Sequence, residues 1–248
     1  AKKDDLIIWL FSGGGSAMLD VPANGLTLQD IIRLDQSLIK SKASIDEINI
    51  IRKHVSRVKG GQLACSTAEA QMVCLYLSDV VGDSIGTVAS GPTVPDTSTF
   101  GQAVEILKHH GLWEKTSASV RTHLEEGVQG KHPETPKKDN ETFCSNRIHN
   151  FLIGGHKLTL DIAVRVATQK GYKVLPWTYR LQGEVSKTVE LLFKKFNALK
   201  KQNNKKSLLL IATGETTMHV RGSGAGGRNQ QVVIESLSYL KENEVLVS

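Results

Sequence analysis

Short apolar runs alternate with longer amphipathic segments along most of the chain. Leu6–Phe11 is a continuous apolar run that ends in glycines, as expected for a parallel strand buried on both faces. Met72–Leu77 and His149–Ile153 predict two further strands. Lys173–Thr178, interrupted by Pro176, predicts a strand at a sheet edge. Further strands are predicted over Ser207–Ala212 and, more briefly, Thr217–Arg221.

The segments between these strands have helical periodicity and recognisable ends. Thr27 is suited to cap a helix from Leu28 to about Lys40, and Ser44–Glu47 has the capping-box pattern of a second helix. Phe100–His110 predicts a third, closed by Gly111. Later helices are predicted over His156–Lys170, Gly183–Lys200 and Asn229–Leu240.

This alternation predicts the α/β class. Strands separated by helices of about 10–18 residues imply βαβ units and a doubly wound, mainly parallel, Rossmann-like sheet. We expect this core over residues 1–206 and the start of a second α/β domain over 207–248.

Clusters of Gly, Ser, Asp and Glu follow the predicted strands rather than precede them. They are Ser12–Ser16, Ser78-Asp79, Gly154-Gly155, Gln182–Glu184 and Thr213–Glu215. In open α/β sheets the ligand crevice lies outside the carboxyl ends of the strands. The sequence therefore predicts a site at that edge.

The first glycine loop consists of Ser12, Gly13, Gly14, Gly15 and Ser16. Such a loop turns with positive φ and exposes backbone N–H groups that bind phosphate or carboxylate. A tight turn that needs glycine for packing alone is the alternative. The flanking hydroxyls favour anion binding.

The second glycine loop, Gly222–Asn229, satisfies Gly-x-Gly-x-x-Gly and raises the possibility of a dinucleotide site. Against that, Thr217–Arg221 resembles half of a hairpin with the preceding strand, and no acidic residue ends the next strand. Arg228 better suits a phosphate clamp. Its proposed neighbours in binding are Gly224, Gly226, Gly227 and Asn229.

Carboxylates at strand ends are candidate ligands for Mg²⁺. Asp79 and Asp83 follow one strand, and Glu215 follows another. A Mg²⁺–nucleotide complex needs one or two such ligands together with phosphate oxygens. Capping of the following turns is the alternative for each of them.

Basic residues concentrate at the end of the second predicted helix. Lys59 precedes Gly60-Gly61, where a catalytic lysine has access to a phosphoryl group, and Arg52 is a candidate phosphate ligand. Cations are also common at helix C-termini for structural reasons alone.

Composition excludes several classes of protein. The chain is 40% hydrophobic and carries a net charge of +6 spread along its length, which favours a small anionic substrate over nucleic acid. It has no apolar run of the ~20 residues that a membrane span requires, nor a signal-peptide core, so membrane association and secretion are not expected. Three cysteines without Cys-x-x-Cys spacing indicate a reducing compartment.

Six stretches, taken in order, resemble the type II glycerate kinases, whose C-terminal part is called the MOFRL domain. They are Ser12–Ala17, Glu47–Gly61, Ser78–Asp83, Ala89–Val94, Gly214–Thr217 and Gly222–Gln230. The resemblance implies transfer of a phosphoryl group from ATP to D-glycerate with Mg²⁺, giving 2-phosphoglycerate. It also implies that 207–248 begins a MOFRL domain. Because members of that family are longer, the chain is expected to be an internal fragment.

The resemblance also suggests roles. Gly13–Gly15 and Gly224–Gly227 would hold phosphate or the glycerate carboxylate, Lys59 and Arg228 would neutralise charge, and Asp79 or Asp83 would hold Mg²⁺ or act as base. Two alternatives remain open: an NAD(P)-dependent hydroxypyruvate reductase, and a binding protein without catalysis. We expect a cytoplasmic location, with a mitochondrial form also open. The oligomeric state, and which loop binds ATP, are left open by the sequence.

Overall fold

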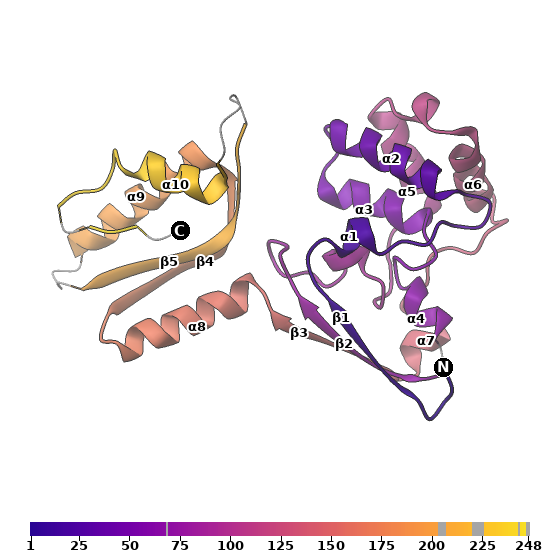
Figure 1. Cartoon of the computed structure of the whole chain (residues 1–248), viewed down its shortest axis with the longest axis horizontal. Coiled ribbons are helices and arrows are strands. Elements are labelled where there is room, and N and C mark those ends of the chain that lie inside the picture. The colour runs from indigo at the N-terminus through magenta and orange to yellow at the C-terminus, as the bar shows by residue number, and fades with distance from the viewer. Residues whose placement is uncertain (68, 203–206, 220–225, 243, 247–248) are drawn as a thin grey trace. The chain divides into compact units, whose positions relative to one another are not determined.

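A computed structural model describes residues 1–67, 69–202, 207–219, 226–242 and 244–246 (Figure 1). These residues form an α/β protein with parallel strand pairs, which confirms the predicted class. The chain divides into two compact units. The first unit comprises Ala1–Val80 and Ser84–Ile153, and the second comprises Val81–Asp83 and Gly154–Ser248.

The first unit is built on a three-stranded sheet in the order β1-β2-β3. Strand β1 (Leu6–Phe11) pairs in parallel with β2 (Gln71–Leu77), and β3 (Ile148–Gly154) is the third strand. The expectation that β1 is buried on both faces is wrong. Its Leu6, Ile8 and Leu10 are exposed, because the core that contains Phe11, Cys74 and Tyr76 lies on the other face.

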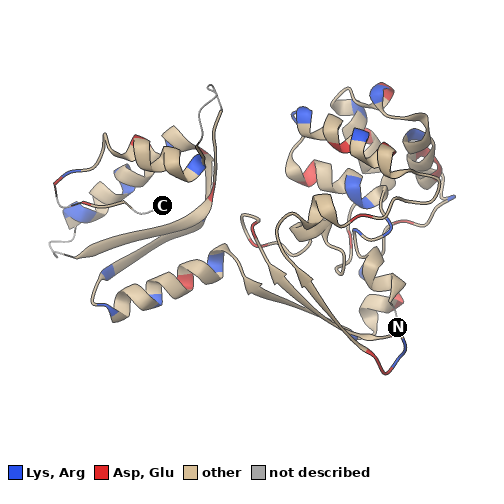
Figure 2. Cartoon of the chain, in the orientation of Figure 1, with Lys and Arg blue, Asp and Glu red and all other residues tan. Residues whose placement is uncertain are grey.

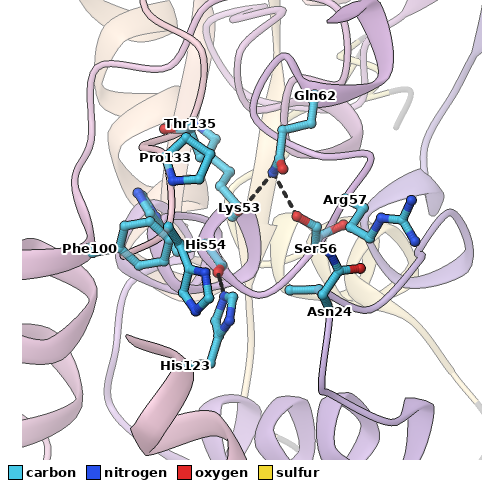
Figure 3. A pocket seen from close by; sticks show the side chains of 12 residues that line it. Asn24, Lys53, His54, Ser56, Arg57, Gln62, Phe100, His123, Pro133 and Thr135 are labelled. Carbon is cyan, nitrogen blue, oxygen red and sulfur yellow. Dashed lines mark hydrogen bonds between the residues drawn. The ribbon is translucent and has the colours of Figure 1, made fainter. Parts of the chain in front are cut away.

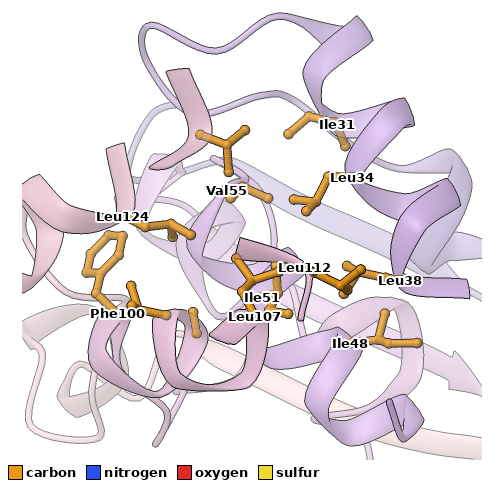
Figure 4. Close-up of a cluster of buried hydrophobic side chains, with 13 residues drawn as sticks. Ile31, Leu34, Leu38, Ile48, Ile51, Val55, Phe100, Leu107, Leu112 and Leu124 are labelled. Carbon is orange, nitrogen blue, oxygen red and sulfur yellow. The ribbon is translucent and has the colours of Figure 1, made fainter. Parts of the chain in front are cut away.

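A second core of the first unit lies among its helices. These are α2 (Leu28–Lys40), α3 (Ile45–His54), α5 (Phe100–His109) and α6 (Ala118–Val128). Figure 4 shows Leu38, Ile51, Leu107 and Leu124 converging in this cluster. Capping boxes at Thr27 and Ser44 begin α2 and α3 where the sequence predicts.

The sequence patterns do not predict α6 or the short helical segments of the first unit. They are α1 (Gly15–Met18), α4 (Gln62–Ser66), α7 (Glu141–Cys144) and the 3₁₀ turns η1 (Val88–Ser90) and η2 (Trp113–Lys115). The polar segment 127–146 contains α7 and the buried side chain of Thr135.

In its described residues, the second unit contains a parallel pair of long strands and three helices. Strand β4 (Lys173–Glu184) pairs with β5 (Leu208–Thr217) from one end to the other. The helices are α8 (His156–Gln169), α9 (Val185–Gln202) and α10 (Arg228–Ser236). The predicted hairpin after Ala212 is wrong, because β5 continues to Thr217 and is parallel to β4. Met218 and His219 are not in a strand.

The predicted boundary at 206/207 does not match the division into units. Pairing of β4 with β5 joins segments from both sides of that boundary, and the units divide between Ile153 and Gly154 instead. The assignment of 207–248 to a MOFRL domain stays a prediction.

Charged side chains are distributed over the helices of both units, with Lys and Arg interspersed among Asp and Glu (Figure 2). Strands β1, β2 and β3 carry no Lys, Arg, Asp or Glu. Among the described residues, no helix combines the length and apolarity needed to cross a membrane.

Candidate functional site

The first glycine loop lies between β1 and α1 and is tightly packed. Gly14 adopts a left-handed conformation with φ of 86°. A Cβ at Gly13 would overlap the carboxylate of Asp79, and one at Gly15 would lie 2.7 Å from the Cβ of Ala89. The fold therefore favours glycine at Gly15, where the rigid Ala89 leaves no room, whereas the flexible Asp79 side chain could move away from a larger residue at position 13. The predicted convergence of the clusters that follow β1 and β2 is confirmed by this contact.

A strained turn supports the loop. Ala89, Ser90 and Gly91 have φ of 52°, 59° and 63°. Left-handed Ala and Ser are uncommon and persist where the surroundings impose them, often at functional sites. Here the N–H of Gly60 donates to the carbonyl of Ser90 at 2.9 Å, and that of Gly61 donates to Gly91 at 2.8 Å. The double glycine thus fixes the turn that contacts the first glycine loop.

A buried polar link joins this turn to α3. The Ser90 hydroxyl lies 2.9 Å from Oδ1 of Asn49 and 3.2 Å from the Ser16 hydroxyl. Ser90 and Asn49 are buried. Sequence reasoning missed Asn49. The sequence feature that could have identified it is a polar amide side chain placed between two isoleucines, on a helix whose neighbouring positions belong to the hydrophobic core.

Lys59 is completely buried, and its side chain contacts the C-cap residue of α1. Its Nζ donates to Oδ2 of Asp20 at 2.6 Å and to the carbonyl of Leu19 at 2.7 Å. Burial lowers the pKa of Lys59, while the hydrogen bond to Asp20 raises it. In this arrangement Lys59 holds the chain that leaves the first glycine loop. A direct contact with a phosphoryl group stays a prediction.

Arg52 is also engaged within the first unit. Its guanidinium makes a two-pronged ion pair with Asp35, with Nε–Oδ1 and Nη2–Oδ2 distances of 2.9 and 3.1 Å. This pair joins α3 to α2. The geometry supports a structural role for Arg52, and its predicted role in phosphate binding remains a prediction.

The two aspartates after β2 differ in what surrounds them. Asp79 is exposed beside Gly13, and its side chain has no hydrogen bond or ion pair to any residue in the described ranges. Asp83 lies in the second unit, with φ of 57°. Its carboxylate oxygens accept the N–H groups of His156 and Lys157 at 3.0 and 2.9 Å. Asp83 therefore caps α8, whereas Asp79 has free oxygens.

The second glycine loop is described only in part. Gly224 and residues 220–225 as a whole lie outside the described residues. After them, Gly227 is the N-cap of α10 and Arg228 begins that helix. Arg228 pairs with Glu215 at 2.6 Å and donates to the carbonyl of Thr216 at 3.2 Å. Both charged side chains are about half exposed. Asn229 is exposed.

A cavity of about 140 Å³ lies elsewhere in the first unit and contains none of the predicted site residues. Figure 3 shows His54, Phe100 and Pro133 on one side of it, and Gln62 and other polar side chains on the opposite side. The Nε2 of His123 contacts the carbonyl of His54 at 2.9 Å, so this nitrogen carries the proton. Its Nδ1 is buried without a partner among the described residues, and burial lowers the pKa of the ring.

Comparisons with known proteins cover the whole chain. The family described as "Domain of unknown function (DUF4147)" matches residues 1–125. The chain is 36% identical over 250 residues to a "Glycerate 2-kinase" of Pyrococcus horikoshii, covering 100% of this chain and 56% of that protein. It is 36% identical over 248 residues to a "D-glycerate 2-kinase" of Thermotoga maritima, covering 99% and 56%. The human "Glycerate kinase" is 32% identical over 270 residues, covering 93% and 50%.

Solved structures agree with these matches. A crystal structure of a glycerate kinase from T. maritima superposes with a TM-score of 0.83 at 36% identity, covering 98% of this chain and 56% of that one. A crystal structure of a P. horikoshii protein gives a TM-score of 0.79 with 98% and 55% coverage. The chain spans about half the length of the curated relatives it matches. It belongs to the DUF4147 family, and its homologues in that comparison are glycerate kinases.

Proposed function

We propose that the protein containing this chain is a glycerate 2-kinase, which transfers a phosphoryl group from ATP to D-glycerate with Mg²⁺ and forms 2-phosphoglycerate. The observation that carries the proposal is the 36% identity, over 99–100% of the chain, to proteins named glycerate 2-kinase and D-glycerate 2-kinase. The position of the first glycine loop at the carboxyl end of β1, against the residues that follow β2, supports it.

The first glycine loop supplies the anion-binding groups in this proposal. Phosphoryl transfer depends mainly on positioning and charge stabilisation, for which the backbone N–H groups of Gly13 and Gly14 are suited. The N–H of Gly15 already donates to the carbonyl of Ser12 at 3.3 Å and would have to exchange that partner for a phosphate oxygen. The contacts of Ala89 with Gly15 and of Ser90 with Ser16 restrain the loop before a ligand arrives. Asn49 and Lys59 act as positioning residues, because they hold Ser90 and the end of α1.

Asp79 is the metal ligand that the geometry favours. A bare carboxylate beside a phosphate-binding loop repels phosphate, and Asp79 would instead hold a Mg²⁺ whose charge offsets that repulsion. The free oxygens of Asp79, next to Gly13, fit this role. Asp83 is less suited, because both of its oxygens already accept N–H groups from α8.

Arg228 is the candidate source of positive charge in the second glycine loop. Its ion pair with Glu215 is half exposed, so Arg228 can exchange that carboxylate for a phosphate oxygen at little cost. Glu215 is then released for Mg²⁺ or for a substrate hydroxyl. Gly226, Gly227 and Asn229 would contribute backbone and amide groups beside it.

The test is a direct product analysis with the full-length protein, Mg²⁺-ATP and D-glycerate. We expect equal amounts of ADP and 2-phosphoglycerate, identified by ³¹P and ¹³C NMR. Formation of 3-phosphoglycerate would support a glycerate kinase but would show that the phosphoryl group is transferred to the hydroxyl at position 3. Oxidation of NADH by hydroxypyruvate without phosphorylation would replace the kinase with a reductase. Ligand binding with no turnover would leave a binding protein.

A cytoplasmic location is part of the proposal and rests on cysteine usage. Three cysteines without metal-type spacing fit a reducing compartment. Cell fractionation with an antibody against the protein tests this location.

A further inference from the structure

One cluster of metal-binding side chains lies outside the proposed kinase site. Glu47, His109 and His110 each offer a ligand atom, and these atoms all lie within 4.8 Å of one another. Glu47 is in the first turn of α3, whereas Arg52 is in its last turn. The histidines are at the end of α5, where His109 is the last residue and His110 the C-cap.

The capping box of α3 fixes the Glu47 carboxylate. Oε2 accepts the N–H of Ser44 at 2.7 Å, and the N–H of Glu47 lies 3.3 Å from the Ser44 hydroxyl. Oε1 then points toward Nε2 of His110, which lies 3.2 Å away. Hydrogen bonds from outside the ligand set, such as the one from the N–H of Ser44, orient the carboxylates that bind metal ions in proteins.

The helices that carry the cluster are anchored in a common core. Ile48 and Ile51 of α3 and Leu107 of α5 are buried together. The N–H of His110 also donates to the carbonyl of Ile106 at 3.1 Å. Ligands on packed helix ends keep their spacing better than ligands on free loops do.

We propose that Glu47, His109 and His110 bind a divalent transition-metal ion of the Zn²⁺ class. Two imidazoles and one carboxylate suit Zn²⁺, Co²⁺ or Ni²⁺, whereas Mg²⁺ prefers oxygen ligands alone. Three protein ligands leave at least one coordination position open. The site is therefore distinct in chemistry from the Mg²⁺ site of the proposed kinase reaction.

The surroundings indicate an anionic fourth ligand. His109 and His110 line a cavity of about 570 Å³ together with Lys40, Lys42 and Lys115. Three ammonium groups oppose a bare cation, but they favour a metal ion whose open position holds a carboxylate or phosphate. The alternative is that Glu47 and His110 form only an ion pair between helices.

Titration of the full chain with Co²⁺ tests the proposal, because Co²⁺ reports tetrahedral coordination by its visible absorbance. We expect one bound Co²⁺ per chain, displaced by Zn²⁺ and bound more tightly with inorganic phosphate present. His109→Ala and His110→Ala should each weaken binding at least about tenfold. Glu47→Gln should do the same while keeping the helix start, because Gln also serves in a capping box.

His149→Ala is the matched control, since His149 is exposed on β3 outside the cluster, and it should leave Co²⁺ affinity unchanged. Circular dichroism should show that every variant is folded. The proposal is overturned if no stoichiometric Co²⁺ binds, or if the cluster variants bind as tightly as the parent. A thiolate charge-transfer band, which would assign the ion to Cys65 or Cys144, would also overturn it. If inorganic phosphate leaves the affinity for Co²⁺ unchanged, the inference of an anionic fourth ligand is wrong.

Discussion

The two glycine loops look alike in sequence but differ in what surrounds them. In the first, Gly15 lies against Ala89, where a Cβ would not fit, and Gly13 lies against the exposed carboxylate of Asp79. In the second, the Cβ position of Gly227 is open, with no atom of the described residues within 4 Å apart from its chain neighbours. Packing thus explains Gly15 and a left-handed backbone explains Gly14, so the presence of these glycines alone does not indicate a ligand. Packing does not explain Gly227, which is the N-cap of α10, a position that accepts glycine.

The charged partners of the two loops show the same contrast. Lys59 is fully buried against Asp20, whose side chain is 9% exposed, whereas Arg228 and Glu215 are half exposed. A buried charge that loses its partner is strongly destabilising, but an exposed pair contributes only about 0–1 kcal/mol. Arg228 is therefore better placed than Lys59 to exchange its partner for a phosphate.

The largest expected effect is on folding, at the buried pair. Lys59→Met leaves Asp20 buried without its cation and should lower the free energy of unfolding by about 3–5 kcal/mol. Arg228→Met, the matched change at the exposed pair, should lower it by less than about 1 kcal/mol. Urea denaturation of both variants measures the difference. Equal losses would remove the contrast between the two loops.

Asp79→Asn should affect the reaction rather than the fold. The side chain is exposed and unpaired in the described part of the chain, so the melting temperature should stay close to that of the parent. Loss of one charged group at the reacting phosphates should reduce kcat by about 10²-fold or more. Steady-state kinetics of the full-length enzyme measures this. Asp83→Asn is the comparison, and it should lower stability through the cap of α8 more than it lowers kcat.

Gly15→Ala should destabilise the first unit by about 1–3 kcal/mol, because the new methyl group overlaps the side chain of Ala89. Ala89→Gly removes that methyl and suits the left-handed backbone, so the double variant should recover at least about 1 kcal/mol. Gly227→Ser, at an extended N-cap, should change stability by less than about 1 kcal/mol. Thermal unfolding of the four variants is the measurement. If the double variant loses as much stability as the two single variants together, the side chains at positions 15 and 89 do not clash.

The smallest effect concerns pH. Burial lowers the pKa of His123 below its ordinary 6.5, so the folded state resists a proton that the unfolded state binds. Stability should therefore fall as the pH drops below about 6.5. His123→Gln keeps a donor for the carbonyl of His54 and should flatten this decline. The exposed His149→Gln should leave it unchanged, and an identical decline in the His123 variant would contradict the assignment.

Much of the first unit follows from local signals in the sequence. Capping residues at Thr27, Ser44 and Thr99 fix the starts of three helices, and β1 follows from its apolar run. The second unit was harder to predict. Gln182–Glu184 has the composition of a loop but extends β4, because pairing with β5 outweighs local preference. Gly214 lies so close to the backbone of Leu181 that only glycine fits, a requirement of strand pairing that no local pattern reveals.

The candidate site was predictable in its location and less so in its contacts. Strand ends brought Gly13 to Asp79, as expected from a parallel sheet. The pairing of Lys59 with Asp20 and of Ser90 with Asn49 joins residues about forty positions apart, and the sequence has no periodic signal for such pairs. Which carboxylate is free and which is a helix cap likewise depends on tertiary contacts.

We expect ligand to bind at the glycine loops and not in the cavity lined by His54, Phe100 and His123. The most direct test is a ¹⁵N-glycine-labelled full-length protein, observed by NMR with and without Mg²⁺-ATP and D-glycerate. We expect the largest amide shifts at Gly13, Gly14 and Gly15, with further shifts at Gly226 and Gly227. Unchanged signals at these glycines, under conditions in which ADP and phosphoglycerate form, would contradict it.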